Sequence, residues 1–396
     1  MFASLFSMYA VPALSGENQK LPSMSPYAIA CAVGGGLIFA EAALLKILRR
    51  ERTAWMELVF NLNSGHIVMW AFRGVEIAAY AAVFRHLNLH SVDRLPRAAQ
   101  WIFGLFAWDF CFYWRHRAHH RLGLLWAVHV VHHQGERFNL SLCNRNSWYA
   151  SLTDFPFSGV LAVLGLPLDV YVTVSSFHYA IQFFNHCGLI QSAGVLDRFL
   201  VTPRHHRVHH RAEPQFFNRN FGGSFLLWDK LFGTFAQTTD HADARYGVDG
   251  IANSRNPLRA SHEPLLHCVG GSWPNGSFSP PQQMNSTFVA LRGLLLYGLL
   301  ICWLDTQQGV HSNPHWLLMV CSLTGTIALG AHCDGERWGT LGWSALAIAM
   351  PALLASDRAA SGTVPTVLLV LFAMHGIFGM IQFARIAPSA SRLPPR

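Results

Sequence analysis

The stretch HRAHHRLGLLWAVHVVHHQGE, residues 116–136, contains six histidines and directly follows an apolar run. Residues three or four positions apart lie on the same face of a helix, and these histidines have that spacing. The aligned histidines are His116 and His120, followed by His129, His132 and His133. The spacing therefore predicts two helices that each project imidazoles from one face. Imidazoles that converge in this way are typical of a metal site.

The composition of the 396-residue chain favours a membrane protein. Hydrophobic residues make up 52% of it and charged residues only 13%, whereas soluble domains average about a quarter charged residues. We therefore predict an all-α fold, a polytopic bundle of membrane helices. The net charge of +8 is typical of positive loops beside anionic lipid. The basic residues form no stripe with interleaved aromatic residues, so nucleic acid is not an expected partner.

Several apolar stretches approach the roughly 20 residues that a helix needs to cross a bilayer. They cover residues 26–48, 66–84, 98–114, 286–304, 315–332, 338–355 and 363–384. Lys46, Arg49 and Arg50 end the first stretch, and basic residues favour the cytoplasmic side. Two further crossings return the chain to that side at the histidines. The sequence thus predicts a multi-pass integral membrane protein whose site faces the cytoplasm, although Arg94 and Arg97 would then lie outside.

Between residues 149 and 182 the chain is again apolar, but Gly165-Leu166-Pro167 interrupts it. Because proline breaks a helix, this segment predicts two short helices that form a hairpin dipping into the membrane. A hairpin returns the chain to the side it left. The lone His186 that follows can therefore rejoin the earlier histidines.

A second histidine-rich stretch, VTPRHHRVHHR, repeats the spacing of the first. Its aligned histidines are His206, His209 and His210. Thr202 and Pro203 suit the N-cap and the first turn of that helix. In FFNHCG, His186 has Gln182 one turn earlier on the same face. Together these stretches hold nine candidate ligands, enough for two ions, and imidazole suits iron, zinc or copper.

Other histidines fit the pattern less well. His119 and His205 each neighbour a candidate ligand but sit off the best-aligned face, so their contact with a metal stays open. Isolated histidines such as His90 and His262 are expected to be ordinary polar residues. The eight cysteines have no paired spacing, so no disulfide framework is expected, in keeping with a reducing cytoplasm.

The motif order HRAHH, HVVHH, FFNHCG and HRVHH resembles the fatty acid hydroxylase/sterol desaturase superfamily. The surrounding sequence segments are most similar to its alkylglycerol monooxygenase branch and the bacterial relatives of that branch. These segments are DFCFYWRHR, TPRHHRVHHR and NFGGSFLLWDKLFGTF. The likeness is strong from about residue 100 to 236. We therefore divide the chain into N-terminal membrane helices over 1–97, a diiron domain over 98–240, a cytoplasmic polar connector over 241–285 and C-terminal membrane helices over 286–396.

The resemblance implies a membrane-bound enzyme that uses two iron ions and O2 to hydroxylate or oxidatively cleave a lipid, such as an alkylglycerol, a fatty acid or a sterol. Zinc lacks the redox chemistry that an unactivated C–H bond requires. The residues that carry over as iron ligands are His116, His120, His129, His132, His133, His186, His206, His209 and His210. Where some relatives have a further histidine, this chain has Gln182, which would hold a metal-bound water or orient His186.

Monooxygenation also consumes two external electrons. The sequence shows no strand–GxGxxG–helix unit and no haem motif, so the electrons are expected from a separate donor. In the alkylglycerol branch that donor is tetrahydrobiopterin, and other branches use a ferredoxin or a cytochrome b5. The sequence leaves these open.

Two carboxylates are expected to act near the metals. Asp109 lies seven residues before His116 on the same helical face and could support a ligand from the outer shell. Glu136, three residues after His133, could do the same or approach a metal directly. For Asp229 in LLWDKLFG a structural cap or packing role is favoured.

Two other functions stay open. A lipid or sterol desaturase could use the same metal core, and a histidine-rich membrane protein could bind or transport metal without redox chemistry. A transporter would place its ligands at mid-membrane on discontinuous helices. Here the histidines follow the apolar runs, which favours the enzyme.

Overall fold

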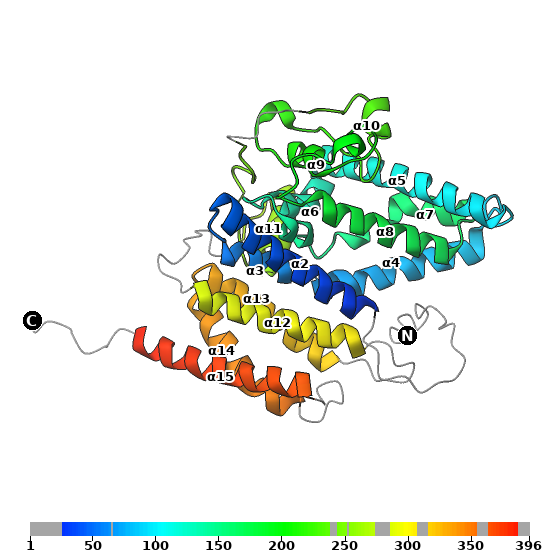
Figure 1. Ribbon diagram of the computed structural model, residues 1–396. Coiled ribbons are helices and arrows are strands. Elements are labelled where there is room, and N and C mark those ends of the chain that lie inside the picture. The colour runs from blue at the N-terminus through cyan, green and yellow to red at the C-terminus, as the bar shows by residue number, and fades with distance from the viewer. Residues whose placement is uncertain are drawn as a thin grey trace, which may run out of the picture. The chain divides into compact units, whose positions relative to one another are not determined.

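The computed structural model of the chain describes residues 26–64, 66–237, 244–251, 253–273, 286–306, 316–354 and 363–386. Within these ranges the regular elements are helices, and strand pairing is limited to isolated antiparallel bridges (Figure 1). The predicted all-α fold is confirmed.

The described residues fall into two compact units, one within residues 33–253 and 259–276, the other within residues 1–32, 254–258 and 277–396. The helices from the N-terminus to the end of the connector are α2 Pro26–Arg49, α3 Trp55–Asn63, α4 His66–Leu87, α5 Arg97–Arg121, α6 Gly123–His133, α7 Phe155–Leu164, α8 Leu168–Asn185, α9 Pro203–His209, α10 Leu227–Leu231 and α11 Pro257–Cys268. Short 3-10 helices are η1 Leu140–Asn144, η2 Ser151–Thr153, η3 Gly194–Arg198 and η4 Pro214–Phe216. The C-terminal helices are α12 Ser286–Thr306, α13 Trp316–Cys333, α14 Arg337–Leu354 and α15 Thr363–Ile386.

Three helical stretches among the described residues are long and apolar enough to cross a membrane. They are Ala28–Arg49, Trp55–Leu87 and Thr287–Asp305. Shorter apolar helices cover Phe155–Leu164, Leu317–Cys333 and Pro365–Ile381. The stretch 98–114 forms part of α5 but does not reach the same apolarity, since Gln100 and Asp109 interrupt its aromatic-rich run. The number and direction of crossings stay predictions.

The centre of the larger unit is α5, which packs against α6, α7 and α8, while α4 packs against α7 and α8 (Figure 1). The buried core between these helices comprises Tyr80, Val92, Trp108, Phe112, Leu161, Ala162, Leu166, Val170, Tyr171 and Val174. Burial of each large apolar side chain contributes roughly 1.5–3 kcal/mol. This core holds α5, and with it the first histidines, in place.

The hairpin predicted from Gly165-Leu166-Pro167 is present. α7 ends at Gly165, whose φ of +90° suits a residue without a side chain, and α8 begins after Pro167. The chain then returns along α8 to His186, which caps its C-terminal end. The hairpin therefore delivers the lone histidine to the part of the fold that holds the others.

The second unit, here called the C-terminal unit, includes α12 to α15 as well as the start of α2 and residues 254–258. In it α14 packs against α13 and α15, and α12 packs against the same two helices. Most of its buried side chains are apolar, among them Leu296, Trp303 and Phe372. Arg292 and Ser344 are buried among them.

Candidate metal centre

The end of α5 and the whole of α6 deliver the first histidines. His116 and His120 lie in the last turns of α5, and Leu122, with an extended backbone of φ −110° and ψ 119°, turns the chain into α6. Because α5 and α6 pack together, the imidazoles of the two helices can meet. The two predicted helices are confirmed.

α9 supplies the third set of histidines, and its start is capped as expected. The hydroxyl of Thr202 and the ring of His205 form a capping box with each other's backbone N–H groups, and Pro203 occupies the first turn. The ring of His205 therefore serves the helix cap. The other histidines of this set, His206, His209 and His210, lie on the following turn.

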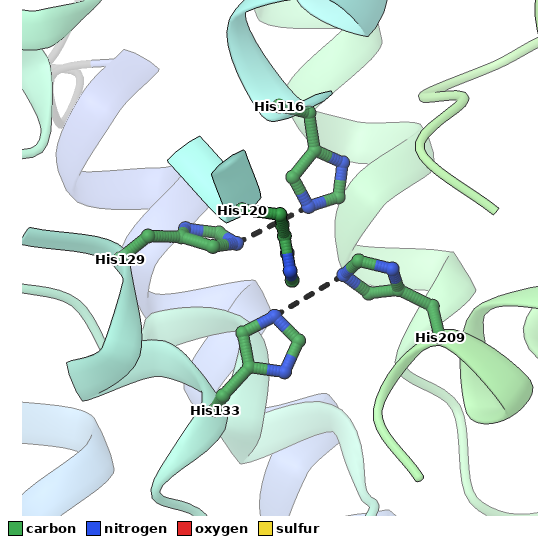
Figure 2. A group of neighbouring side chains, drawn as sticks. All are labelled: His116, His120, His129, His133 and His209. Carbon is green, nitrogen blue, oxygen red and sulfur yellow. Dashed lines mark hydrogen bonds between the residues drawn. The ribbon is translucent and has the colours of Figure 1, made fainter. Parts of the chain in front are cut away.

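Five histidines from α5, α6 and α9 point toward a common centre, as Figure 2 shows. They are His116, His120, His129, His133 and His209, here called the five-histidine group. Their candidate ligand atoms lie within 4.8 Å of one another. Nε2 of His116 is 3.1 Å from Nε2 of His129, and Nε2 of His133 is 3.2 Å from Nε2 of His209.

Four further histidines, all buried, form a second cluster with the same 4.8 Å limit. They are His132, His186, His206 and His210, here called the four-histidine group. Their Nε2 atoms are separated by 3.2 Å for His132 and His186, by 3.0 Å for His186 and His206, and by 3.1 Å for His206 and His210.

The two groups lie side by side. His132 and His133 are consecutive on α6, as are His209 and His210 at the end of α9, and each pair contributes one residue to each group. The rings of His133 and His210 stack with centroids 4.4 Å apart. The structure thus brings all nine predicted ligands into two adjoining groups.

The spacing within each group suits ligands of a metal ion. Metal–nitrogen bonds of about 2.0–2.1 Å place neighbouring ligand atoms roughly 2.9–3.4 Å apart, depending on geometry. The facing Nε2 atoms, 3.0–3.2 Å apart, fall within this interval. The donor set therefore fits one ion in each group.

Backbone carbonyl oxygens orient several of these imidazoles. The Nδ1 atoms pair as follows: His116 with Phe221 O at 2.9 Å, His132 with Arg145 O at 3.0 Å, His186 with Gln182 O at 2.7 Å and His209 with Arg219 O at 2.8 Å. A carbonyl oxygen only accepts, so Nδ1 must carry the hydrogen, which leaves the lone pair of Nε2 for a metal. Two of the carbonyls belong to residues 219–225, here called the carbonyl loop.

Burial keeps the imidazoles neutral. It lowers the pKa of His186 and of His209 to about 4. For His206 and His210, burial and then repulsion from neighbouring imidazoles hold the pKa well below its usual range. Metal binding requires the neutral ring, which is the form present at neutral pH.

Asp109 hydrogen-bonds the loop whose carbonyls orient His116 and His209. This buried carboxylate of α5 accepts hydrogen bonds from the N–H groups of Ser224 at 2.8 Å and Phe225 at 3.2 Å, and from Nε1 of Trp228 at 2.9 Å. Its hydrogen bonds therefore go to the carbonyl loop and α10 rather than to His116. The support of His116 expected from Asp109 stays a prediction, and it would act through the carbonyl of Phe221 in that loop.

Asp229 holds the same loop from the other side. Its carboxylate, buried in α10, accepts from the N–H groups of Phe221 and Gly222, each at 2.8 Å, and from the hydroxyl of Thr234 at 2.7 Å. Phe221 is the residue whose carbonyl accepts from His116. The two aspartates thus fix the loop that orients part of the five-histidine group.

Sequence reasoning left His178 unassigned, yet it is buried beside this loop. Its Nδ1 lies 2.9 Å from the Ser224 hydroxyl and 3.3 Å from a carboxylate oxygen of Asp109. Gly223 packs directly on the ring, where a Cβ would lie only 2.0 Å from Cε1. The signal available in the sequence was the four-residue spacing from His178 to Gln182, which continues to His186.

Gln182 uses its backbone and its side chain differently. Its carbonyl oxygen accepts from His186, whereas its side-chain Nε2 donates to the carbonyl of Gly223 at 2.6 Å. The amide therefore ties α8 to the carbonyl loop. Of the two roles left open for Gln182, this geometry favours positioning.

Glu136 and His119, whose contact with a metal the sequence leaves open, lie outside both histidine groups. Glu136 is exposed, and its carboxylate accepts from Nδ2 of Asn253 at 2.9 Å. Nε2 of His119 lies 2.9 Å from the hydroxyl of Thr153, and its Nδ1 lies 2.8 Å from the carbonyl of Arg115.

Two buried glutamates anchor the segments that follow α6 and α8. Glu41 of α2 accepts from the N–H groups of Leu140 and Gly188, both at 2.6 Å. Glu57 of α3 accepts from the N–H of Glu136 at 2.8 Å. Nothing in the spacing of the histidines pointed to these carboxylates, because they lie far away in the chain.

A pocket opens beside Glu41 and Glu57. Its apolar lining comes from Ile38, Ala42, Leu45 and Leu58. The polar lining includes the carboxylates of Glu41, Glu51 and Glu57 together with Arg52, Arg137 and Asn139. Phe138 lies between Arg137 and Asn139 in the chain. The centroid of its ring is 5.8 Å from that of His186 and 5.7 Å from that of His210. Phe138 thus packs on the four-histidine group, and its two neighbours in the chain line the pocket.

The fold and the site define a helical protein with apolar helices and two adjoining histidine groups suited to metal. Residues 101–234 match the family model described as Fatty acid hydroxylase. All nine histidines, Asp109 and Asp229 fall within the matched residues.

Several characterised proteins are similar to this chain. Alkylglycerol monooxygenase of Danio rerio is 38% identical over 189 residues, which are 46% of this chain and 42% of that protein. Its counterpart in Xenopus tropicalis is 33% identical over 201 residues, 50% of this chain and 43% of that protein. Ornithine lipid hydroxylase OlsE of Rhizobium tropici is 31% identical over 168 residues, 41% of this chain and 51% of that protein. The chain thus spans about half the length of these relatives, or less, and no solved structure matches it.

Proposed function

We propose that this protein is a membrane-bound diiron monooxygenase that uses O2 to hydroxylate or oxidatively cleave a lipid. The observation that carries the proposal is the pair of adjoining all-histidine groups, whose facing Nε2 atoms have the separations of metal ligands. The fatty acid hydroxylase domain and the similarity to proteins named monooxygenases and hydroxylases support it.

In this proposal the five-histidine group holds one iron ion and the four-histidine group holds the other. Bound iron would supply the redox chemistry with O2 that imidazole lacks. For four of the nine rings, those of His116, His132, His186 and His209, a backbone carbonyl accepts from Nδ1–H, which keeps Nε2 deprotonated and directed inward. Burial of the four-histidine group keeps bulk water away from it.

The substrate is proposed to be a lipid because the relatives are named for alkylglycerol and ornithine lipid. The pocket of α2 and α3 supports this class through its apolar wall, which suits an acyl chain and lies beside the carboxylates of Glu41, Glu51 and Glu57 and the cations of Arg52 and Arg137. We place the site at the cytoplasmic face, where a tetrahydrobiopterin, a ferredoxin or a cytochrome b5-like donor could deliver electrons.

The test uses the purified chain reconstituted with Fe2+, each candidate donor in turn, and a panel of an alkylglycerol, an ornithine lipid, a fatty acid and a sterol. We expect lipid-dependent O2 uptake and, from 18O2, a labelled hydroxyl group in the product. A desaturase would consume O2 but form an unlabelled alkene. A protein that only binds or transports metal would show no lipid-dependent uptake.

The variant His132→Ala should abolish this activity and lower the iron content, because the remaining rigid imidazoles cannot replace the lost donor. The matched control is His90→Ala, which removes an exposed histidine paired with Asp93 and should keep turnover within about a factor of two. Full lipid-dependent O2 uptake by His132→Ala would refute the diiron proposal.

A further inference from the structure

The C-terminal unit buries a cation for which the described part of the chain supplies no ion pair. Arg292 lies in the second turn of α12, within the Thr287–Asp305 stretch that is apolar enough to cross a membrane, and its side chain is fully buried. None of its three guanidinium nitrogens has a hydrogen-bond partner. The ion pairs found among the described residues do not include it.

Three neighbouring side chains also have buried polar atoms that find no hydrogen-bond partner among the described residues. They are Trp343 through Nε1 and Ser344 through its hydroxyl, both in α14, and His375 of α15 through both ring nitrogens. Cζ of Arg292 lies 4.2 Å from the ring centroid of Phe288 and 5.2 Å from that of Trp343. The ring of His375 stacks on Phe288 at 4.0 Å. These unpaired groups therefore form one cluster shared by three helices.

The position of Gly379 in α15 shows that the side chains of Arg292 and Ser344 converge. A Cβ on Gly379 would lie 2.4 Å from the hydroxyl oxygen of Ser344 and 3.0 Å from Nη2 of Arg292. Both polar atoms thus approach the same point of α15, and the residue at that point has no side chain to pair with them.

Contact with aromatic rings does not satisfy the hydrogen-bonding groups of Arg292. The faces of Phe288 and Trp343 attract the guanidinium charge, but they leave its N–H groups unbonded in a membrane-spanning helix, where an ionised side chain is expected to have a partner. The guanidinium and the indole only donate hydrogen bonds, and the hydroxyl can donate. The missing partner is therefore an acceptor of negative charge, and the planar guanidinium fork matches carboxylate or phosphate.

We propose that the C-terminal unit binds an oxyanion, a carboxylate or phosphate group, between Arg292, Trp343, Ser344 and His375. Arg292 and Trp343 each lie about 9 Å along the axis from the first residue of their helix, at a rise of about 1.5 Å per residue. This depth suits the headgroup of an anionic amphiphile, although a free phosphate ion presents the same chemistry. The site is independent of the proposed diiron function.

The test measures binding to the full chain in a nonionic detergent, by native mass spectrometry and by thermal shift. The probes are oleate, its uncharged ester methyl oleate, and inorganic phosphate. We expect oleate to bind at least about tenfold more tightly than methyl oleate. Binding of oleate alone assigns the site to an amphiphile headgroup, whereas binding of phosphate that competes with oleate assigns it to the oxyanion itself.

Arg292→Met should weaken oleate binding at least about tenfold, whereas Arg337→Met, which removes an exposed cation at the start of the same unit's α14, should not change it. Ser344→Ala, a smaller change that preserves packing, should weaken binding about threefold and covers the case in which Arg292→Met does not fold. His132→Ala should bind oleate normally, which separates this site from the histidine groups. Wild-type protein that binds neither oleate nor phosphate, or Arg292→Met that binds oleate as wild type does, would overturn the proposal.

Discussion

For single residues, the hydrogen bond at the ring nitrogens distinguishes histidines that share the same stretch of sequence. His116 and His209 donate Nδ1–H to carbonyls and turn Nε2 inward. His119 instead places Nε2 against the hydroxyl of Thr153, and His205 uses its ring to cap α9. Adjacent imidazoles thus differ in role because their partners differ, not because their intrinsic chemistry does.

The two aspartates that hold the carbonyl loop give a prediction at this scale. In Asp229→Asn the amide replaces one acceptor oxygen with a donor, so an N–H of Phe221 or Gly222 loses its partner. The five-histidine group should lose metal affinity by about 10–100-fold, a loss typical of outer-shell changes, and iron content should fall toward one ion per chain. Asp109→Asn should weaken activity or metal loading without eliminating it.

Iron analysis of the purified variants checks this expectation. The control is Asp249→Asn, which alters an exposed aspartate paired with Arg245 and should load iron as wild type does. Full iron content and rate in Asp229→Asn would show that the loop does not position the ligands.

For the helices and loops, glycine decides how closely two elements approach at the site. The carbonyl loop passes so near α8 that Gly223 touches the ring of His178. The same loop accepts hydrogen bonds from the side chains of Gln182 and Asn185 through the carbonyl of Gly223. Loop and helix therefore behave as one packed layer behind the histidine groups.

Gly223→Ala should destabilise the protein. The added Cβ would lie 2.0 Å from Cε1 of His178 and 2.7 Å from Cδ1 of Phe112, and overpacking of a core typically costs about 1–3 kcal/mol. Thermal unfolding in detergent should show a lower Tm. Gly123→Ala at the start of α6 is the matched control, since its Cβ would meet nothing within 4 Å. Equal Tm values for both variants would contradict the tight approach of loop and helix.

For the whole molecule, burying many neutral imidazoles couples stability to pH. The pKa of His186 and of His209 is lowered by burial to about 4, whereas an unfolded histidine titrates near 6.5. Below about pH 6.5 the unfolded chain therefore binds protons that the folded chain does not. Stability must fall as the pH drops from about 6.5 toward 4.

Metal-free protein should accordingly lose stability across that pH window, by roughly 3 kcal/mol for each such group once the window is crossed. Unfolding of the metal-free chain by denaturant at a series of pH values measures this. His186→Phe, which cannot titrate, should show a shallower decline, while His90→Ala should follow the wild type. A stability that stays constant from pH 7 to 4.5 would rule out buried neutral histidines.

The expected topology gives a second prediction for the whole molecule. The predicted crossings place residue 250 and the C-terminus in the cytoplasm, and place residue 310, which lies outside the described residues, on the other side. Tags at these positions, probed with a protease or a label that cannot cross the membrane, test this arrangement. Opposite sides for residue 250 and the C-terminus would contradict it.

The sequence by itself determined the features that depend on local backbone geometry. The 3.6-residue helical period predicted which histidines share a face, Gly165 and Pro167 marked the hairpin, and Thr202 marked the start of α9. Each of these needs only residues within a turn or two of one another. The family resemblance added iron and a lipid, which no periodicity encodes.

Only the tertiary structure decided how the nine histidines divide into clusters of five and four. It also decided which hydrogen-bond partners hold the surrounding segments in place. His116 pairs with Phe221 across 105 residues, Asp109 with Ser224 across 115, and Glu41 with Gly188 across 147. No local pattern records contacts of this separation, because they depend on how whole helices pack. The same holds for Arg292, whose apolar helix gives no sign that Ser344 and His375 would be buried beside it without partners.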